Sequence, residues 1–127
     1  MSNTGLEVFD KTLHETNHYL NIVLREMGTD DRRVALAALR ATLHALRDRL
    51  MAMDAVHLGA QLPMLLRGLY YEDWRPAEAF AKERHAKEFL AHVEALLLPQ
   101  LKDYAEVCCR AALAAIEGNI DPGETHK

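Results

Sequence analysis

The sequence predicts an all-α domain of about six helices, arranged as two related helical-hairpin halves, with a Pro-kinked helix pair capping the first half. Apolar residues recur every three to four positions, which is typical of amphipathic helices. Gly28, Pro63 and Pro99 stand where these periodic segments end. The 127 residues, half of them apolar, suit one domain with its own core.

The first amphipathic helix is expected over residues 9–27. We expect Asp10 to cap its beginning and Gly28 to end it, because Gly readily takes the left-handed conformation that closes a helix. Its apolar positions share one face at 100° per residue, which predicts burial of that face: Phe9, Leu13, Thr16, Leu20, Val23, Leu24 and Met27.

The second helix is expected over residues 31–50, with Thr29 or Asp30 as its cap. Leucines form one stripe along it, and small residues form a second stripe nearly opposite. A helix that is apolar on two sides is usually packed on both, so this helix should be central. The leucine stripe is Leu36, Leu39, Leu43, Leu46 and Leu50, and the small stripe is Val34, Ala38, Ala41 and Ala45.

A helix-kink-helix insertion is expected at residues 54–73. Asp54 suits the cap of a short helix that ends near residue 61. Pro63 stops or kinks the chain and suits the first turn of a helix over residues 64–73. We expect the insertion to fold over the two long helices and cap the core.

The second half repeats the first at an offset of seventy residues. A helix is expected over residues 79–97, Pro99 breaks it, and a last helix runs to about residue 117. Because the apolar phase persists across two helices and their connection, an internal repeat of residues 9–50 and 79–120 is favoured over chance. Matching residues include Tyr19 with Phe89, Val23 with Val93, Leu39 with Cys109, Leu43 with Leu113 and Leu46 with Ile116.

Composition argues against several classes of function. The net charge of −4 disfavours general nucleic-acid binding. The chain start has no signal-peptide pattern, and the apolar runs are too short to span a membrane. The adjacent Cys108 and Cys109 imply no disulfide framework. We therefore expect a cytoplasmic protein, without a cofactor and without membrane association.

Charged and aromatic side chains gather in the block of residues 39–76. One interpretation is a structural ion-pair network that joins the helix over 31–50 to the helix over 64–73. The other is a binding site for an anion or small ligand, since Arg suits bidentate recognition of phosphate or carboxylate. The candidate residues are Arg47, Arg49, Arg67, Tyr70, Glu72 and Trp74.

His14, Glu15 and His18 form a literal H-E-x-x-H pattern on the first predicted helix. In metalloproteases two histidines one turn apart bind zinc, and the glutamate is the general base. Here both histidines point away from the predicted apolar face, and no third ligand follows in the usual pattern. We therefore expect a solvated helix face and assign no metal site.

The same central block resembles the bacterial domain-of-unknown-function family 2267. The resemblance is carried by LRATLHALRDRL at 39–50, AVHLGAQLP at 55–63 and RGLYYEDW at 67–74, and more loosely by residues 16–20. It implies an all-α bundle built as two related halves and supplies no catalytic residue. The second half here departs from longer members, which repeat the Gln-Leu-Pro segment.

These patterns favour a non-enzymatic interaction module that self-associates. The second half lacks a helix-kink-helix, so we expect it to leave an apolar strip uncovered near Leu96, Leu97, Leu113 and Ile116. The alternative function is a small-ligand or anion binder, with or without enzymatic activity, that uses the arginine and aromatic cluster.

Overall fold

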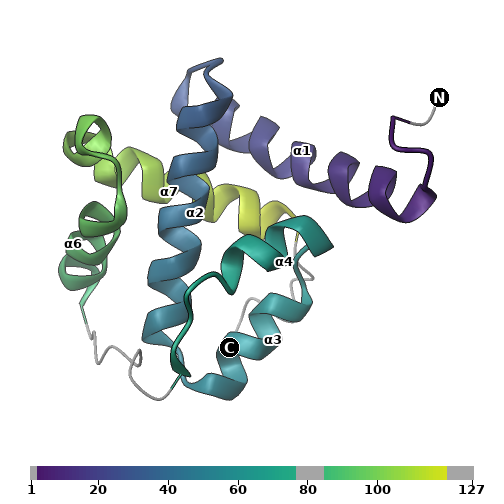
Figure 1. Cartoon of the computed structure of the whole chain (residues 1–127). Helices are drawn as coiled ribbons and strands as arrows, with labels where there is room; N and C mark the ends of the chain where they lie inside the picture. Colours follow the sequence, from purple (N-terminus) through teal and green to yellow (C-terminus); the bar gives the residue numbers. More distant parts are fainter. Residues whose placement is uncertain (1–2, 77–84, 120–127) are drawn as a thin grey trace.

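The protein is all-α, as the sequence predicts. The computed structural model describes residues 3–76 and 85–119, and no strand occurs in these ranges. None of the helices in this part of the chain is long and apolar enough to cross a membrane. The elements, shown in Figure 1, are α1 (Glu7–Met27), α2 (Arg32–Arg49), α3 (Ala52–Ala60), α4 (Met64–Tyr70), α6 (Ala86–Leu96), the 3-10 helix η1 (Pro99–Tyr104) and α7 (Ala105–Asn119).

Helix α2 is the centre of the fold (Figure 1). It contacts α1, α3, α4, α6 and α7, which are all the other α-helices in the described part of the chain. Leu39 and Leu43 of the leucine stripe are fully buried, and so are Ala38 and Ala45 of the small stripe. This confirms that the helix is packed on two sides. Leu36 is an exception, because it remains exposed near the beginning of the helix.

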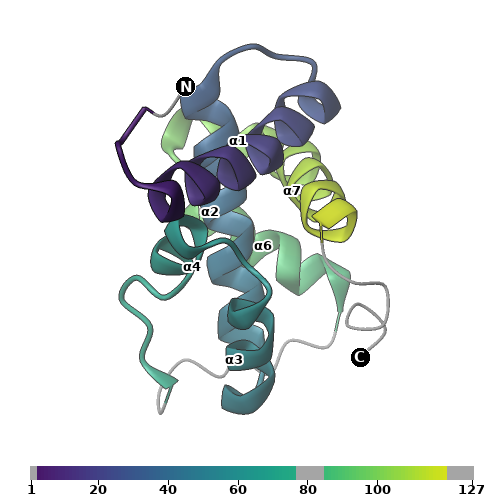
Figure 2. The same cartoon turned by 90° about the vertical axis from the view of Figure 1, so that its right-hand side faces the viewer.

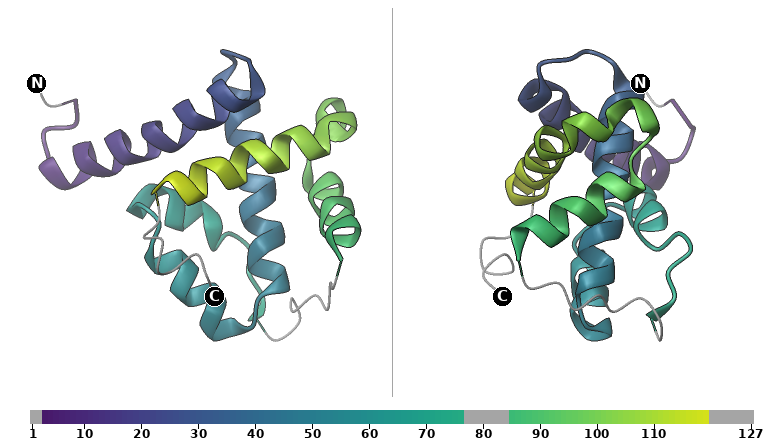
Figure 3. Two further views of the ribbon diagram at one scale, coloured as in Figure 1. Left: turned by 180° about the vertical axis from the view of Figure 1, so that it is seen from behind. Right: turned by 90° about the vertical axis from the view of Figure 1, so that its left-hand side faces the viewer.

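Helices α1 and α7 lie side by side and run in opposite directions across α2 (Figure 3). Tyr19 and Val23 of α1 and Ile116 of α7 belong to the buried core between them. The expected uncovered strip is therefore wrong at two positions, since Ile116 and Leu97 are both buried. Leu113 is partly buried against the core, and only Leu96 is exposed.

The caps expected for α1 and α3 are wrong. Helix α1 begins at Glu7 with Leu6 in the cap position. The carboxylate of Asp10 instead accepts hydrogen bonds from the backbone N–H and the hydroxyl of Thr4, at 3.1 and 2.8 Å. Helix α3 begins at Ala52, which leaves Asp54 inside its first turn.

The cap of α2 is one residue later than expected. Asp31 accepts a hydrogen bond from the backbone N–H of Arg33 at 3.0 Å, and Thr29 and Asp30 do not cap the helix. Gly28 does end α1, as predicted, with a left-handed φ of 70°. Its backbone N–H bonds back to the carbonyls of Leu24 and Arg25.

The inserted helices cap the first half of the fold. Figure 2 shows α4 below the first half of α1 and beside α2, and both contacts are present. The hydroxyl of Thr12 in α1 accepts a hydrogen bond from the backbone N–H of Leu65 at 2.9 Å, which supports the open first turn of α4. Helix α4 ends at Tyr70, before the predicted residue 73, and Asp73 has a left-handed φ of 55°.

The second half consists of α6, η1 and α7 among the described residues. The beginning of the helix predicted over 79–97 lies outside those residues, and its described part is α6. Pro99 opens η1, so the last α-helix starts at Ala105 rather than at residue 101 or 103. Several positions seventy apart are buried in both halves, namely Tyr19 and Phe89, Val23 and Val93, Leu39 and Cys109, Ala41 and Ala111, and Ala45 and Ala115. Two predicted matches differ, because Leu43 and Ile116 are buried whereas Leu113 and Leu46 are only partly buried. The duplication itself stays a prediction.

Candidate functional site

Three polar residues of α2 hold the end of α4. Arg40, His44 and Arg47 are spaced by four and three residues, so they share one face of the helix. Nη1 of Arg47 donates to the carbonyls of Tyr70 and Glu72, at 2.9 and 2.5 Å. The carbonyls at a helix end have no partner within the helix, and the guanidinium supplies one.

His44 and Arg40 extend this contact. Nε2 of His44 lies 2.7 Å from the carbonyl of Leu69, which makes this nitrogen the donor. Burial lowers the pKa of His44, and the nearby Arg47 and Arg40 lower it further, although the bond to Leu69 acts in the opposite direction. Nη2 of Arg40 forms a partly exposed ion pair with Glu72 at 2.7 Å.

Asp48 continues the network from Arg47 towards α6. Nε of Arg47 donates to Asp48 at 2.9 Å, and both side chains are largely buried. The other carboxylate oxygen of Asp48 lies 3.6 Å from Nε2 of His92 in α6. The Arg47 guanidinium therefore donates to three oxygens of the protein, namely the carbonyls of Tyr70 and Glu72 and the carboxylate of Asp48.

Arg67 holds a different helix end. Its Nε donates to the carbonyl of Gly59 at 3.0 Å, and its Nη2 donates to the carbonyl of Leu62 at 2.9 Å. The hydroxyl of Tyr70 donates to the carbonyl of Ala55 at 2.6 Å. Arg67 and Tyr70 thus join α4 to α3, whereas Arg47 joins α4 to α2.

The aromatic residues pack around Gly59. The rings of Tyr70 and Tyr71 meet edge to face with centroids 5.0 Å apart, and Trp74 lies 5.4 Å from Tyr71. A Cβ at Gly59 would come 2.7 Å from Cζ of Tyr71, which is closer than real contacts allow. Arg49 does not join this group, because its guanidinium lies over the ring of Phe89, 5.2 Å from the centroid.

A groove of about 550 Å³ runs along the outer side of α2. We call it the α2 groove. Its apolar lining comes from α2, α4 and the end of α6, and its charged lining includes Arg33 in the first turn of α2 and Asp73 after α4. The sequence singled out neither Arg33 nor Leu98 as part of a site. The apolar lining residues are Leu36, Ala37, Ala41, Leu69, Leu96 and Leu98.

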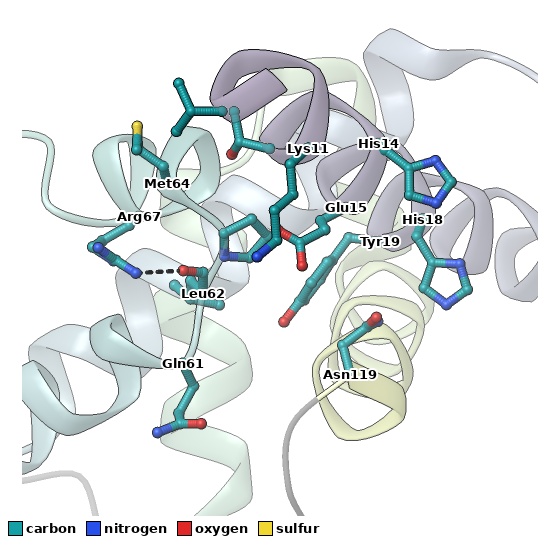
Figure 4. Close-up of a pocket in the computed structure, with 13 residues that line it drawn as sticks. Lys11, His14, Glu15, His18, Tyr19, Gln61, Leu62, Met64, Arg67 and Asn119 are labelled. Carbon is teal, nitrogen blue, oxygen red and sulfur yellow. Dashed lines mark hydrogen bonds between the residues drawn. The ribbon is translucent and has the colours of Figure 1, made fainter. Parts of the chain in front are cut away.

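His14, Glu15 and His18 are exposed, as expected for a solvated face of α1. They also line a second concavity of about 530 Å³, between α1 and the joint that precedes α4. We call it the α1 cleft. Figure 4 shows the two imidazoles at one edge of the cleft. Within residues 3–76 and 85–119, no three His, Cys, Asp or Glu side chains are grouped so that they could hold a metal ion.

Comparison with known proteins supports the resemblance seen in the central block. No curated protein matches the chain. The family model described as "Uncharacterized conserved protein (DUF2267)" matches residues 16–127, which include α2, the inserted helix pair and the second half. The chain therefore belongs to the DUF2267 family of uncharacterised conserved proteins.

Proposed function

We propose that this protein is a non-enzymatic cytoplasmic helical module that self-associates through the α2 groove. One observation carries the proposal. Leu36, Leu96 and Leu98 line the same concave surface, although they come from two distant segments, and they are 36%, 43% and 49% exposed. Apolar side chains gathered on one concave surface are typical of protein interfaces.

The charges around the groove favour a second copy of the chain as its occupant. A two-fold interface brings the same patch of both copies together, so the patch must complement itself. Arg33 and Asp73 have opposite charges, and neither side chain forms an ion pair within the described residues. A two-fold axis through the leucines would bring Arg33 of one copy towards Asp73 of the other.

A structural role for the arginine and aromatic cluster supports a non-enzymatic module. The guanidinium groups of Arg47 and Arg67 donate to backbone carbonyls at helix ends. Burial raises the pKa of the Cys108 and Cys109 thiols, which disfavours the nucleophilic thiolate. Because the guanidinium groups of Arg47 and Arg67 already have protein partners, we assign the arginine and aromatic cluster to architecture rather than to ligand binding.

Sedimentation equilibrium on single variants tests the proposed interface. Leu96→Asp places a charge among the groove leucines and should weaken dimerisation at least about tenfold. Met53→Asp is the matched control, because Met53 is a more exposed apolar residue on α3 outside the groove. Equal dissociation constants for wild type and Leu96→Asp would contradict the proposal.

A double-mutant cycle tests the orientation of the two copies. Arg33→Gln and Asp73→Asn each remove one charge, and Asn tolerates the left-handed backbone of residue 73. If the two charges meet across the interface, the double variant should dimerise better than the sum of the single losses predicts. Strictly additive losses would contradict the two-fold arrangement.

A further inference from the structure

The α1 cleft has the size and lining of a small-molecule site. Its volume of about 530 Å³ lies within the range of about 300–1,000 Å³ that is common for ligand pockets. One wall is α1, the opposite wall is the joint at Gln61, Leu62 and Pro63, and Asn119 of α7 lies at the end (Figure 4). Arg67 fixes the joint through its bonds to backbone carbonyls.

Tyr19 brings an unused hydrogen-bond donor to the cleft. The residue is only 2% exposed, and its hydroxyl has no hydrogen-bond partner among the described residues. Figure 4 shows the ring projecting from α1, with the hydroxyl directed between Leu62 and Asn119. Burial, and then the charge of Glu15, raise the pKa of Tyr19 to about 12, so the hydroxyl keeps its proton and can donate. A buried hydroxyl without a partner is unfavourable, and a bound acceptor would satisfy it.

Two opposite charges lie one helical turn apart beside Tyr19. Lys11 and Glu15 both project into the cleft in Figure 4. Neither side chain forms an ion pair or a hydrogen bond within the part of the chain that the structure describes. A simple anion bound near Lys11 would be repelled by Glu15, and a simple cation bound near Glu15 would be repelled by Lys11.

From this arrangement we propose that the α1 cleft binds a small zwitterion of the α-amino-acid class. The ligand carboxylate accepts a hydrogen bond from the Tyr19 hydroxyl and pairs with the Lys11 ammonium. The ligand ammonium pairs with the Glu15 carboxylate. Charge-assisted bonds of this kind are the stronger ones, and three partners around one cleft select a ligand with both charged groups.

Titration of the full chain with L-α-amino acids, followed by amide NMR shifts, tests this proposal. At least one amino acid should bind at millimolar concentration or below and shift residues of the cleft. Its N-acetyl derivative lacks the ammonium charge and its amide lacks the carboxylate, so each should bind about tenfold more weakly or worse. If no amino acid binds, or if acetate or inorganic phosphate binds as tightly as the amino acid, the proposal is overturned.

Matched variants separate binding from folding. Tyr19→Phe keeps the buried ring and removes only the unpartnered hydroxyl, so the melting temperature should hold while affinity falls about tenfold. Lys11→Gln should also weaken binding, whereas Lys87→Gln, at an exposed position of α6, should not. Unchanged affinity in Tyr19→Phe would overturn the assignment of this hydroxyl as a ligand donor.

Discussion

Nη1 of Arg47 donates a hydrogen bond to the carbonyl of Tyr70 at 2.9 Å, and this bond joins the central helix α2 to the end of α4. The same nitrogen reaches the carbonyl of Glu72 at 2.5 Å, so one buried guanidinium serves the last carbonyl of α4 and one just beyond it. Arg suits this role because its planar group presents several donors in a fixed geometry. The arginine therefore acts as a helix cap supplied by another helix.

Replacement of Arg47 should strongly destabilise the protein. Arg47→Met keeps the apolar stem but leaves two carbonyls and the Asp48 carboxylate without their donor. Removing one partner of a buried ion pair typically costs about 3–5 kcal/mol. The free energy of unfolding, measured by urea titration, should fall by a similar amount. Arg40→Met is the control, since its pair with Glu72 is partly exposed and should contribute about 0–1 kcal/mol. Equal losses for the two variants would contradict this role.

The two glycines of the inserted helices should respond oppositely to alanine. Gly59→Ala forces a Cβ into the Tyr71 ring and should cost about 1–3 kcal/mol through overpacking. Gly68→Ala meets nothing within 4 Å and should stabilise α4 by about 0.5–1 kcal/mol. Thermal unfolding monitored by circular dichroism measures both, and a stabilising Gly59→Ala would show that Tyr71 does not restrict this position.

Sequence periodicity predicted the elements that local pattern determines. The apolar stripes placed α1 and α2 within two residues of their observed ends, because amphipathic burial decides where these helices lie. The end of α4 could not be found in this way. It depends on Arg47, which is far away in the sequence, and on the left-handed backbone at Asp73.

The candidate surfaces were harder to predict than the helices. Burial of Ile116 depends on the contact between α1 and α7, which the repeat pattern alone does not specify. The α2 groove combines Leu36 with Leu98, and no local spacing relates two residues so far apart. The spacing of Arg40, His44 and Arg47 was the available signal for a polar face on α2, and it could have been recognised from helical periodicity.

Stability should fall in mild acid because of His44. Its folded-state pKa lies below the ordinary value of 6.5, so the unfolded chain binds the proton more tightly than the folded chain. The free energy of unfolding should therefore be highest above pH 6.5 and decrease as the pH falls through the folded pKa. In His44→Gln, which keeps a donor for the Leu69 carbonyl, the dependence of the unfolding free energy on pH should be shallower, by at most one proton. Identical pH profiles of the unfolding free energy for wild type and His44→Gln, measured by urea titration, would contradict this role of His44.

The adjacent cysteines should be unreactive in the folded protein. Cys108 and Cys109 are buried, and desolvation raises the pKa of both thiols. Alkylation by iodoacetamide should therefore be slow in buffer and fast in denaturant, because the thiolate is the reacting form. Tyr104→Cys, in a background with both native cysteines replaced by alanine, provides an exposed thiol as the control. Native labelling at the rate of this exposed thiol would contradict the burial.

The molar mass of the wild-type protein as a function of concentration, measured by light scattering, tests the central claim most directly. If the α2 groove joins two copies, the mass should rise towards twice the 14.3 kDa of one chain. The Leu96→Asp variant should stay near 14.3 kDa under the same conditions. A wild-type mass that stays at 14.3 kDa up to millimolar concentration would contradict self-association through this groove.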